Sequence, residues 1–191
     1  MFSQRTSLPL SNETPSYQVS CTQCGSPLGT SDNPDAYDAY RLRKPQLAIS
    51  SAGTCPVSYP YEKWFTSHLL HCLESQGVRK FIVRRQSAQP AAVKIWVFSP
   101  SLTISSSAAE TNGPHQVMKV MWQDCEPGEA ESEKLNAQQL SEGDIDVPEH
   151  EFQELISALK SSGLLLPENA RSFQQWRVGL LSQFVAERVR G

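Results

Sequence analysis

Long apolar runs are absent from the sequence. The longest ones, such as Val93 to Phe98 and Gly163 to Leu166, fall far short of the roughly 20 residues that a helix needs to cross a bilayer. The amino terminus, Met1 to Tyr17, is polar and rich in Ser, Thr and Pro, so it has no apolar core of the kind a secretory signal carries. We therefore expect no transmembrane segment, no membrane partner and a chain that stays inside the cell.

An excess of positive charge is also missing. The 191 residues include 17 Lys and Arg against 20 Asp and Glu, which gives a formal net charge of -3. Phosphate backbones are bound by clustered Lys and Arg in excess of acidic residues, so nucleic acid is not an expected partner and proteins are. Hydrophobic residues make up 39% of the chain, which is enough apolar material to build a core.

The five cysteines lack the spread spacing of a disulfide framework. Cys21 and Cys24 form a tight Cys-x-x-Cys pair, and Gly25 behind them can supply the positive φ that turns backbone amides toward the sulfurs. This pattern predicts a zinc knuckle, a structural zinc ion and a reducing compartment. A thioredoxin-like redox role is the weaker alternative, because the helix amino terminus that activates a redox thiol does not follow the pair.

A structural zinc ion needs four ligands, so the knuckle would need two more. Within the chain, the candidates for these ligands are Cys55, His68, His71 and Cys72. His68 and Cys72 lie four residues apart, a spacing that puts both on one face of a helix and lets them share a metal. The competing interpretation buries Cys72 in the core, since it falls on an apolar stripe beside Leu69.

Apolar spacing predicts three helices. The first spans Pro60 to Gln76, with Gly77 as its carboxy-terminal cap. The second begins at Pro148 and ends at Gly163, and it has apolar residues at i, i+3, i+4 and i+7. The third begins at Pro167. Its predicted apolar stripe consists of Phe173, Trp176, Leu180, Leu181 and Phe184.

Short runs rich in β-branched and aromatic residues predict strands. Arg79 to Arg85 and Val93 to Phe98 should form a hairpin, and Ser101 to Ser105 and Gln116 to Gln123 should extend the same sheet. Tyr40 to Ile49 is predicted as an edge strand, because Pro45 interrupts it. The connections lack crossover helices, so a mostly antiparallel sheet in an α+β fold is expected, with one central helix and two carboxy-terminal helices.

The predicted domain organisation is simple. Residues 1–18 carry two prolines among polar residues and are expected to form a disordered arm. Residues 19–191 are expected to form one ordered domain. Within that domain, Asp124 to Asp144 is acidic and is predicted to be a surface loop, with a weaker alternative role in binding a partner.

Three segments carry recognisable motifs. Val19 to Gly29 contains Cys-Thr-Gln-Cys-Gly followed by Leu-Gly, and Lys94 to Ser106 is an apolar strand and turn with Met118-Lys119-Val120 further on. Residues 164–186 contain the third and most specific motif, which begins at a Leu-Pro pair. Its signature residues are Leu166, Pro167, Arg171, Phe173, Trp176, Gly179, Leu180 and Leu181.

In this order the three segments resemble the HECT-like ubiquitin ligases, a family also called ubiquitin-conjugating-enzyme-binding proteins. The resemblance covers about residues 19 to 185. It implies that the protein binds a ubiquitin-conjugating enzyme, accepts ubiquitin as a cysteine thioester and transfers it to lysines of a protein substrate, of the cyclin type for some members. Family members are usually longer, so we expect the carboxy-terminal part of a longer protein, located in the cytoplasm with the nucleus as a second site.

Such a transfer needs an accessible thiol that ionises readily. Cys55 lies in a loop before a predicted helix and is the candidate nucleophile, although a plain loop thiol is the simpler interpretation. Acidic neighbours, Asp124 among them, would raise the pKa of Cys125. No segment aligns with the catalytic region of conventional HECT ligases, so the nucleophile stays unassigned. The alternative function is a non-catalytic, zinc-stabilised adaptor that binds the conjugating enzyme and a substrate.

The signature also suggests a docking surface. Arg171, Phe173 and Trp176 are residue types favoured at protein interfaces. However, the predicted helical stripe favours core positions for Phe173 and Trp176, and Arg171 could pair with an acidic residue inside the domain.

Overall fold

The structure is a computed structural model that describes residues 2–6, 17–31, 40–48, 50, 55–87, 89, 91–105, 114–125 and 142–184. The chain divides into two compact units, Met1–Tyr59 and Pro60–Gly191. The sequence predicted one ordered domain over residues 19–191. The boundary at Tyr59 divides this range into two units. Each unit has its own sheet, and the sequence gives no strong signal for this boundary because it lies in an ordinary Pro- and Ser-containing stretch.

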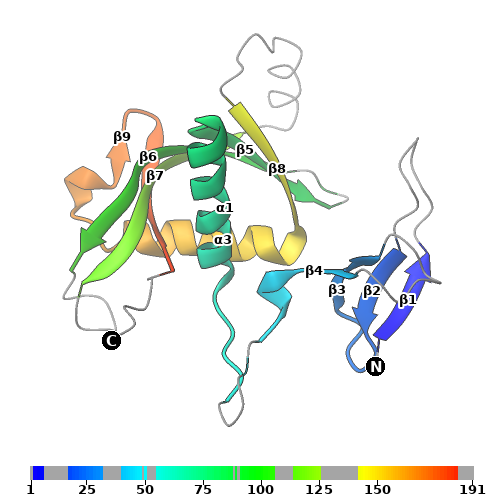
Figure 1. The fold of residues 1–191 in the computed structure, drawn as a ribbon. Helices are drawn as coiled ribbons and strands as arrows, with labels where there is room; N and C mark the ends of the chain where they lie inside the picture. Colours follow the sequence, from blue (N-terminus) through cyan, green and yellow to red (C-terminus); the bar gives the residue numbers. More distant parts are fainter. Residues whose placement is uncertain are drawn as a thin grey trace. The chain divides into compact units, whose positions relative to one another are not determined.

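The first unit contains a four-stranded antiparallel sheet in the order β1-β2-β3-β4 (Figure 1). Its strands are β1 (Phe2–Thr6), β2 (Tyr17–Cys21), β3 (Pro27–Ser31) and β4 (Tyr40–Leu42). A 3-10 helix, η1 (Lys44–Gln46), follows β4.

Two sequence predictions for this unit need correction. Strand β1 and the first residues of β2 lie inside the segment expected to be a disordered arm. They pair through their backbones from Phe2 with Cys21 to Thr6 with Tyr17, and such pairing leaves little trace in apolar patterning. The predicted strand Tyr40 to Ile49 ends at Leu42, because Pro45 has the fixed φ of a helical first turn and lies in η1. Ile49 lies outside the described residues.

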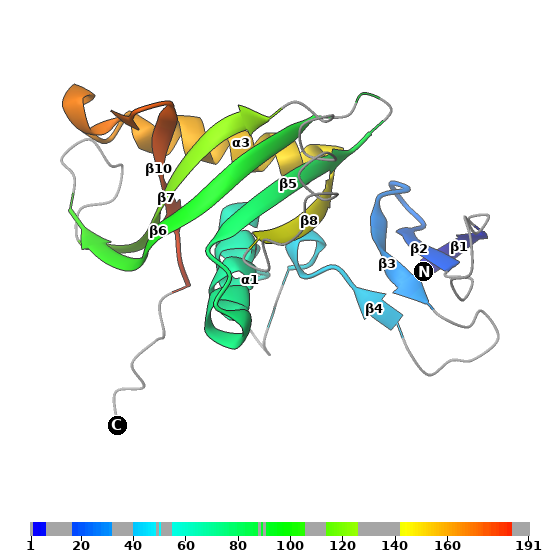
Figure 2. The ribbon, with the colours of Figure 1, turned by 90° about the horizontal axis from the view of Figure 1, so that it is seen from above.

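The second unit is built on a six-stranded sheet in the order β8-β5-β6-β7-β10-β9 (Figure 2). Its strands are β5 (Lys80–Gln86), β6 (Ala92–Ile104), β7 (His115–Cys125), β8 (Glu142–Pro148), β9 (Ser172–Phe173) and β10 (Trp176–Ser182). All pairs are antiparallel except β5 with β8, which is parallel. The predicted α+β class and mostly antiparallel sheet are therefore confirmed.

The hairpin of β5 and β6 is confirmed, but the strand expected at Ser101 to Ser105 is not separate. It is the end of the 13-residue β6, which shifts register against β7 between Val97 and Ser99 and again between Ser99 and Leu102. Such bulges bend a strand without ending it. Strand β8 was not expected, because its alternating Asp144, Ile145, Asp146 and Val147 follow directly on an acidic stretch.

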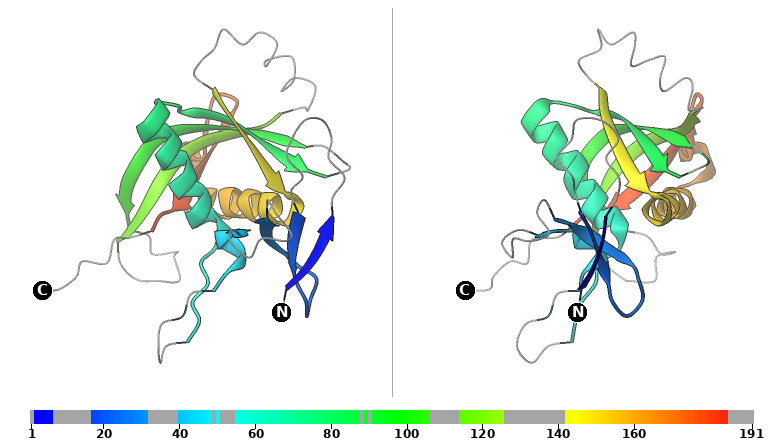
Figure 3. Two further views of the ribbon diagram at one scale, coloured as in Figure 1. Left: turned by 45° about the vertical axis from the view of Figure 1, so that its right-hand side comes forward. Right: turned by 90° about the vertical axis from the view of Figure 1, so that its right-hand side faces the viewer.

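Helices α1 (Tyr61–Gln76) and α3 (Glu149–Gly163) confirm the first two predicted helices. Gly77 has a φ of 72° and donates its N–H to the Leu73 carbonyl at 3.0 Å, which ends α1. Both helices cover the same face of the sheet (Figure 3). The core between these helices and the sheet consists of Tyr61, Phe65, Leu69, Val78, Phe81, Val83, Val93, Ile95, Val97, Met118, Val120, Trp122, Val147, Phe152, Leu155, Leu159 and Leu181. Neither helix has the length and hydropathy of a membrane span.

The third predicted helix is wrong. The segment after Pro167 forms a 3-10 helix, η2 (Glu168–Ala170), followed by the strand pair β9 and β10. Residues 178–181 are all buried, since β10 lies inside the sheet between β7 and β9. A strand buried on both faces has a continuous apolar run, which also fits a helical stripe.

Gly179 of the signature lies where α3 packs closely against β10. A Cβ atom at this position would lie 2.8 Å from Cδ2 of Leu159. Nearby, the backbone N–H of Leu180 donates a hydrogen bond to the Ser162 hydroxyl at 2.9 Å. The missing side chain therefore lets α3 lie directly on β10.

We predict that Gly179→Ala destabilises the protein by roughly 1–3 kcal/mol, because it overpacks this contact. Urea unfolding of the single variant and of Gly179→Ala in a Leu159→Ala background measures the coupling. The penalty of Gly179→Ala should shrink when the Leu159 side chain is shortened. An equal penalty in both backgrounds would show that Leu159 is not the obstacle.

Candidate functional site

The Cys21 and Cys24 pair lies at the tip of the β2–β3 hairpin. The N–H of Cys21 donates to the Ser26 carbonyl, and the N–H of Gly25 donates to the Cys21 carbonyl, each at 2.9 Å. Gly25 has a φ of 72°, the left-handed conformation that its sequence position predicts. The turn therefore folds back on itself in the manner of a knuckle and carries both thiols on one tip.

Hydrogen bonding in the knuckle favours the thiolate of Cys24. Its Sγ lies 3.2 Å from the Ser26 hydroxyl. The Ser26 side chain, followed by the Ser26 backbone and the Cys21 side chain, lowers the pKa of Cys24 below its usual value. Cys24 is exposed and Cys21 is half-buried. A thiol that ionises more readily suits both metal ligation and nucleophilic attack.

The knuckle supplies two ligands of the four that a structural zinc ion requires. Across the described ranges, no third His, Cys, Asp or Glu joins the two cysteines in a metal-binding group. The two thiolate-forming residues and the turn that carries them are of the kind found in structural zinc sites.

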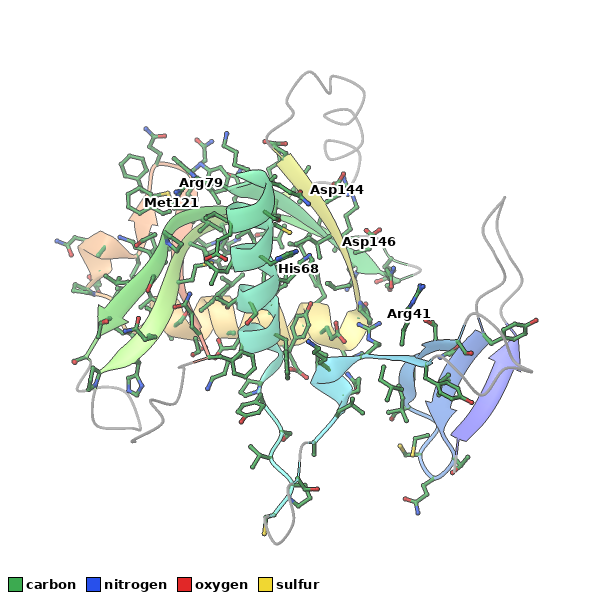
Figure 4. The ribbon with its side chains drawn as sticks, viewed as in Figure 1. Arg41, His68, Arg79, Met121, Asp144 and Asp146 are labelled. Carbon is green, nitrogen blue, oxygen red and sulfur yellow. The ribbon has the colours of Figure 1, made fainter. Side chains whose placement is uncertain are left out.

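His68 and Cys72 form a second pair, one turn apart on α1 of the second unit. The Sγ of Cys72 lies 3.8 Å from Nε2 of His68, so the predicted sharing of one helix face is confirmed, and Figure 4 labels His68 on this helix. His68 and His71 are exposed. Cys72 is half-buried and packs against the core, as the competing interpretation of this residue predicted.

The last two cysteines differ in exposure. Cys55 is exposed, whereas Cys125 is 7% exposed and packs with Ile82 and Ala92 at the end of β7. Burial makes Cys125 unavailable to a protein thioester. All five cysteines are free thiols.

Two cavities of the second unit contain no thiol. One of about 310 Å³ lies between the start of α1 and α3, and its acidic lining includes Glu62 and Glu154. The other, of about 230 Å³, opens on the sheet beside Lys94 and Trp176. Neither of these two cavities is lined by a cysteine, so neither encloses a candidate thiol.

The signature residues divide between core and surface. Gly179, Leu180 and Leu181 are buried in β10. Within the described part of the chain, Arg171 pairs with backbone carbonyls and not with an acidic residue. Its side chain donates to the Leu166 carbonyl at 2.8 Å and to the Leu164 carbonyl at 3.3 Å. It therefore holds the turn after α3 in shape.

The core assignment of the two aromatic signature residues is not upheld. Phe173 is 53% exposed on β9, and Trp176 is half-buried on β10. Both lie on strands, where side chains alternate between the two faces of a sheet, and not on the helix that the apolar stripe suggested.

The sequence interpretation also missed a surface on the sheet face away from the helices, which we call the outer sheet face. Trp96, Phe98 and Trp176 lie there with Lys80, Lys94 and Lys119. The signal was available in Lys94-Ile95-Trp96-Val97-Phe98, where Ile95 and Val97 alternate with residues of the opposite face.

Comparison with known proteins identifies the family. A family model described as HECT-like ubiquitin-conjugating enzyme (E2)-binding matches residues 3–178. The chain belongs to this family. An uncharacterized protein of Schizosaccharomyces pombe is 27% identical over 179 residues, which cover 89% of this chain and 49% of that protein. The chain thus spans about half the length of this curated relative. No solved structure matches.

We predict that Cys24 reacts with iodoacetamide at lower pH than an ordinary thiol, because only the thiolate attacks and the pKa of Cys24 is lowered. Ser26→Ala removes the largest cause, so the rate profile should shift to higher pH and the rate at neutral pH should fall. Mass spectrometry of the metal-free protein measures the rate, with Cys55 as the internal control. Identical profiles with and without the Ser26 hydroxyl would contradict this account.

Proposed function

We propose that this chain is the part of a ubiquitin ligase that binds a ubiquitin-conjugating enzyme and promotes transfer of ubiquitin to lysines of a protein substrate. The family match over residues 3–178 carries this proposal. A cyclin-type substrate and an intracellular location in cytoplasm or nucleus rest on the family resemblance alone.

For a thioester on this chain, Cys72 has the most suitable neighbour. A thiol is commonly activated by an imidazole within reach, and His68 Nε2 is 3.8 Å from its sulfur. In such a transfer His68 accepts the Cys72 proton, and the thiolate attacks the thioester carbonyl while the thiolate of the conjugating enzyme leaves. A substrate lysine amine then attacks the carbonyl of the Cys72 thioester, the bond to the Cys72 sulfur breaks as the isopeptide bond forms, and the amine's proton restores the Cys72 thiol. Cys55, the nucleophile considered from the sequence, is supported by its exposure.

We also propose that Cys21 and Cys24 hold a structural zinc ion. The small size of the first sheet supports this role: among its described residues, Val19 is the buried apolar side chain, and Ser20 and Ser31 are the buried polar ones. Small units with so little apolar burial usually need a metal or another staple. The alternative function is an adaptor. In that case the cysteines of the knuckle serve only to bind zinc, and no cysteine of this chain carries ubiquitin as a thioester.

A ubiquitin-charged conjugating enzyme separates the ligase from the adaptor. We expect a ubiquitin adduct on this chain that thiol reductant removes, and we expect Cys72→Ser to abolish it or to make it resistant to reductant. Cys55→Ser tests the other exposed candidate, and it should leave the adduct unchanged if Cys72 carries the ubiquitin. Denaturing electrophoresis with and without reductant is the readout. The adaptor would be supported if no adduct forms and if each of the single Cys→Ser variants still promotes transfer of ubiquitin to the substrate.

Zinc content tests the knuckle. We expect the purified protein to bind zinc, and we expect Cys21→Ser or Cys24→Ser to lose it, while Cys72→Ser keeps it. Chelation should expose the amides of β2 and β3 to hydrogen exchange and leave α1 and α3 protected, because the second unit has its own core. An intact Cys21–Cys24 disulfide without metal would instead favour a redox pair.

A further inference from the structure

The outer sheet face is organised by strand register. Lys80, Trp96, Met121 and Val178 are successive Cα partners across β5, β6, β7 and β10. In the neighbouring row Lys94 is the partner of both Ile82 and Gln123. These side chains lie on the face that is opposite to α1 and α3, and Met121 lies on the side of the sheet away from α3 in Figure 4.

Aromatic rings on this face are packed together and partly exposed. The ring centroids of Trp96 and Trp176 are 6.2 Å apart, and those of Trp96 and Phe98 are also 6.2 Å apart, both with edge-to-face geometry. Phe98 is 50% exposed, whereas Met121 and Val178 are 5% and 4% exposed beside these rings. The rings are therefore fixed in place before any partner arrives, which lowers the entropic cost of binding.

A cavity of about 230 Å³ opens beside Trp176. Polar groups of Lys80, Lys94, Gln123 and Glu142 line it together with Ile82. Its volume is below the roughly 300–1,000 Å³ of a small-molecule pocket. It suits the insertion of one large side chain from a protein partner.

Among the described residues of this surface, lysines gather around the aromatic rings, although the chain as a whole is acidic. Lys80, Lys94 and Lys119 surround the rings, while Glu142 stands at the cavity edge and the chain as a whole carries -3. Asp144, further along β8, forms an ion pair with Arg84, and Asp146 is the Cα partner of Arg84. The lysine excess is therefore concentrated around the aromatic rings, where acidic groups of a partner would be attracted.

The ring geometry favours an acidic protein over single-stranded nucleic acid. Nucleic acids use aromatic side chains as flat platforms on which bases stack. Here Lys80 Nζ lies 5.9 Å from the Trp96 centroid, and Lys119 Nζ lies 5.3 Å from the Phe98 centroid. These ammonium groups and the ring edges occupy the positions where bases would stack.

We propose that the outer sheet face binds an acidic segment of a partner protein, which places one large apolar side chain in the cavity beside Trp176. The lysines pair with the carboxylates of the segment, and Phe98 and Trp96 contact its apolar groups. This inference stands apart from ubiquitin transfer, because it concerns neither the thiols nor the knuckle.

Selection of a random peptide library displayed on phage against the intact chain tests the proposal. We expect the enriched peptides to be rich in Asp and Glu with an aromatic or long aliphatic residue. A synthetic peptide with an enriched sequence should change the tryptophan fluorescence of the protein when it binds. Its affinity for the protein should fall as the salt concentration is raised. Lys94→Glu and Lys119→Glu should each weaken binding by about tenfold or more. Lys160→Glu, an exposed charge reversal on α3, is the matched control and should have no effect.

Several outcomes would overturn the proposal. They are enrichment of basic or neutral peptides, no enriched peptide, and binding that survives both charge reversals. Two further results would assign the face to another occupant: tight binding of oligothymidylate that Lys94→Glu abolishes, or concentration-dependent dimers that Phe98→Ala dissolves. The assay contains neither ubiquitin nor a conjugating enzyme, so its failure would leave the ligase proposal untouched.

Discussion

The apolar side chains of α1 and α3 cover one face of the six-stranded sheet, and the other features of this unit depend on that contact. Leu69 and Leu155 are fully buried in it, and Gly179 lets α3 approach β10 closely enough to complete it. With one face used in this way, the alternation of strand side chains directs Trp96, Lys94 and Lys119 to the other. The core thereby fixes which residues are offered to partners.

Local patterns allowed correct prediction where one periodicity was unambiguous. Helix α3 has polar residues between its apolar ones, so only a helix puts Phe152, Leu155 and Leu159 on one side. The segment at Val178 to Leu181 is apolar at every position and fits both a helix and a buried strand. Only the pairing of β10 with the distant β7 decides between them, and that pairing is a long-range property.

The candidate sites also differ in whether they arise from local sequence or from long-range strand pairing. The turn at Gly25 and the His68–Cys72 contact arise within a few residues, so spacing alone predicted both. The outer sheet face needs β5, β6, β7 and β10 side by side before Trp96 meets Trp176, 80 positions later in the chain. Arg171 could not be assigned from its residue type. Arginine is common at protein interfaces, but this side chain donates hydrogen bonds to backbone carbonyls of its own unit.

The two cysteine pairs have different physical settings, and this difference separates their proposed roles. Among the described side chains of the first unit, Val19 is the buried apolar one, so metal ligation at Cys21 and Cys24 would add stability to this unit. The second unit already has a core that includes Trp122 and needs no such staple. Cys72 is therefore not needed as a metal ligand for the stability of this unit. In the proposed transfer, His68 can instead accept the proton of the Cys72 thiol. Structural zinc in one unit and a reactive thiol in the other are compatible for this reason.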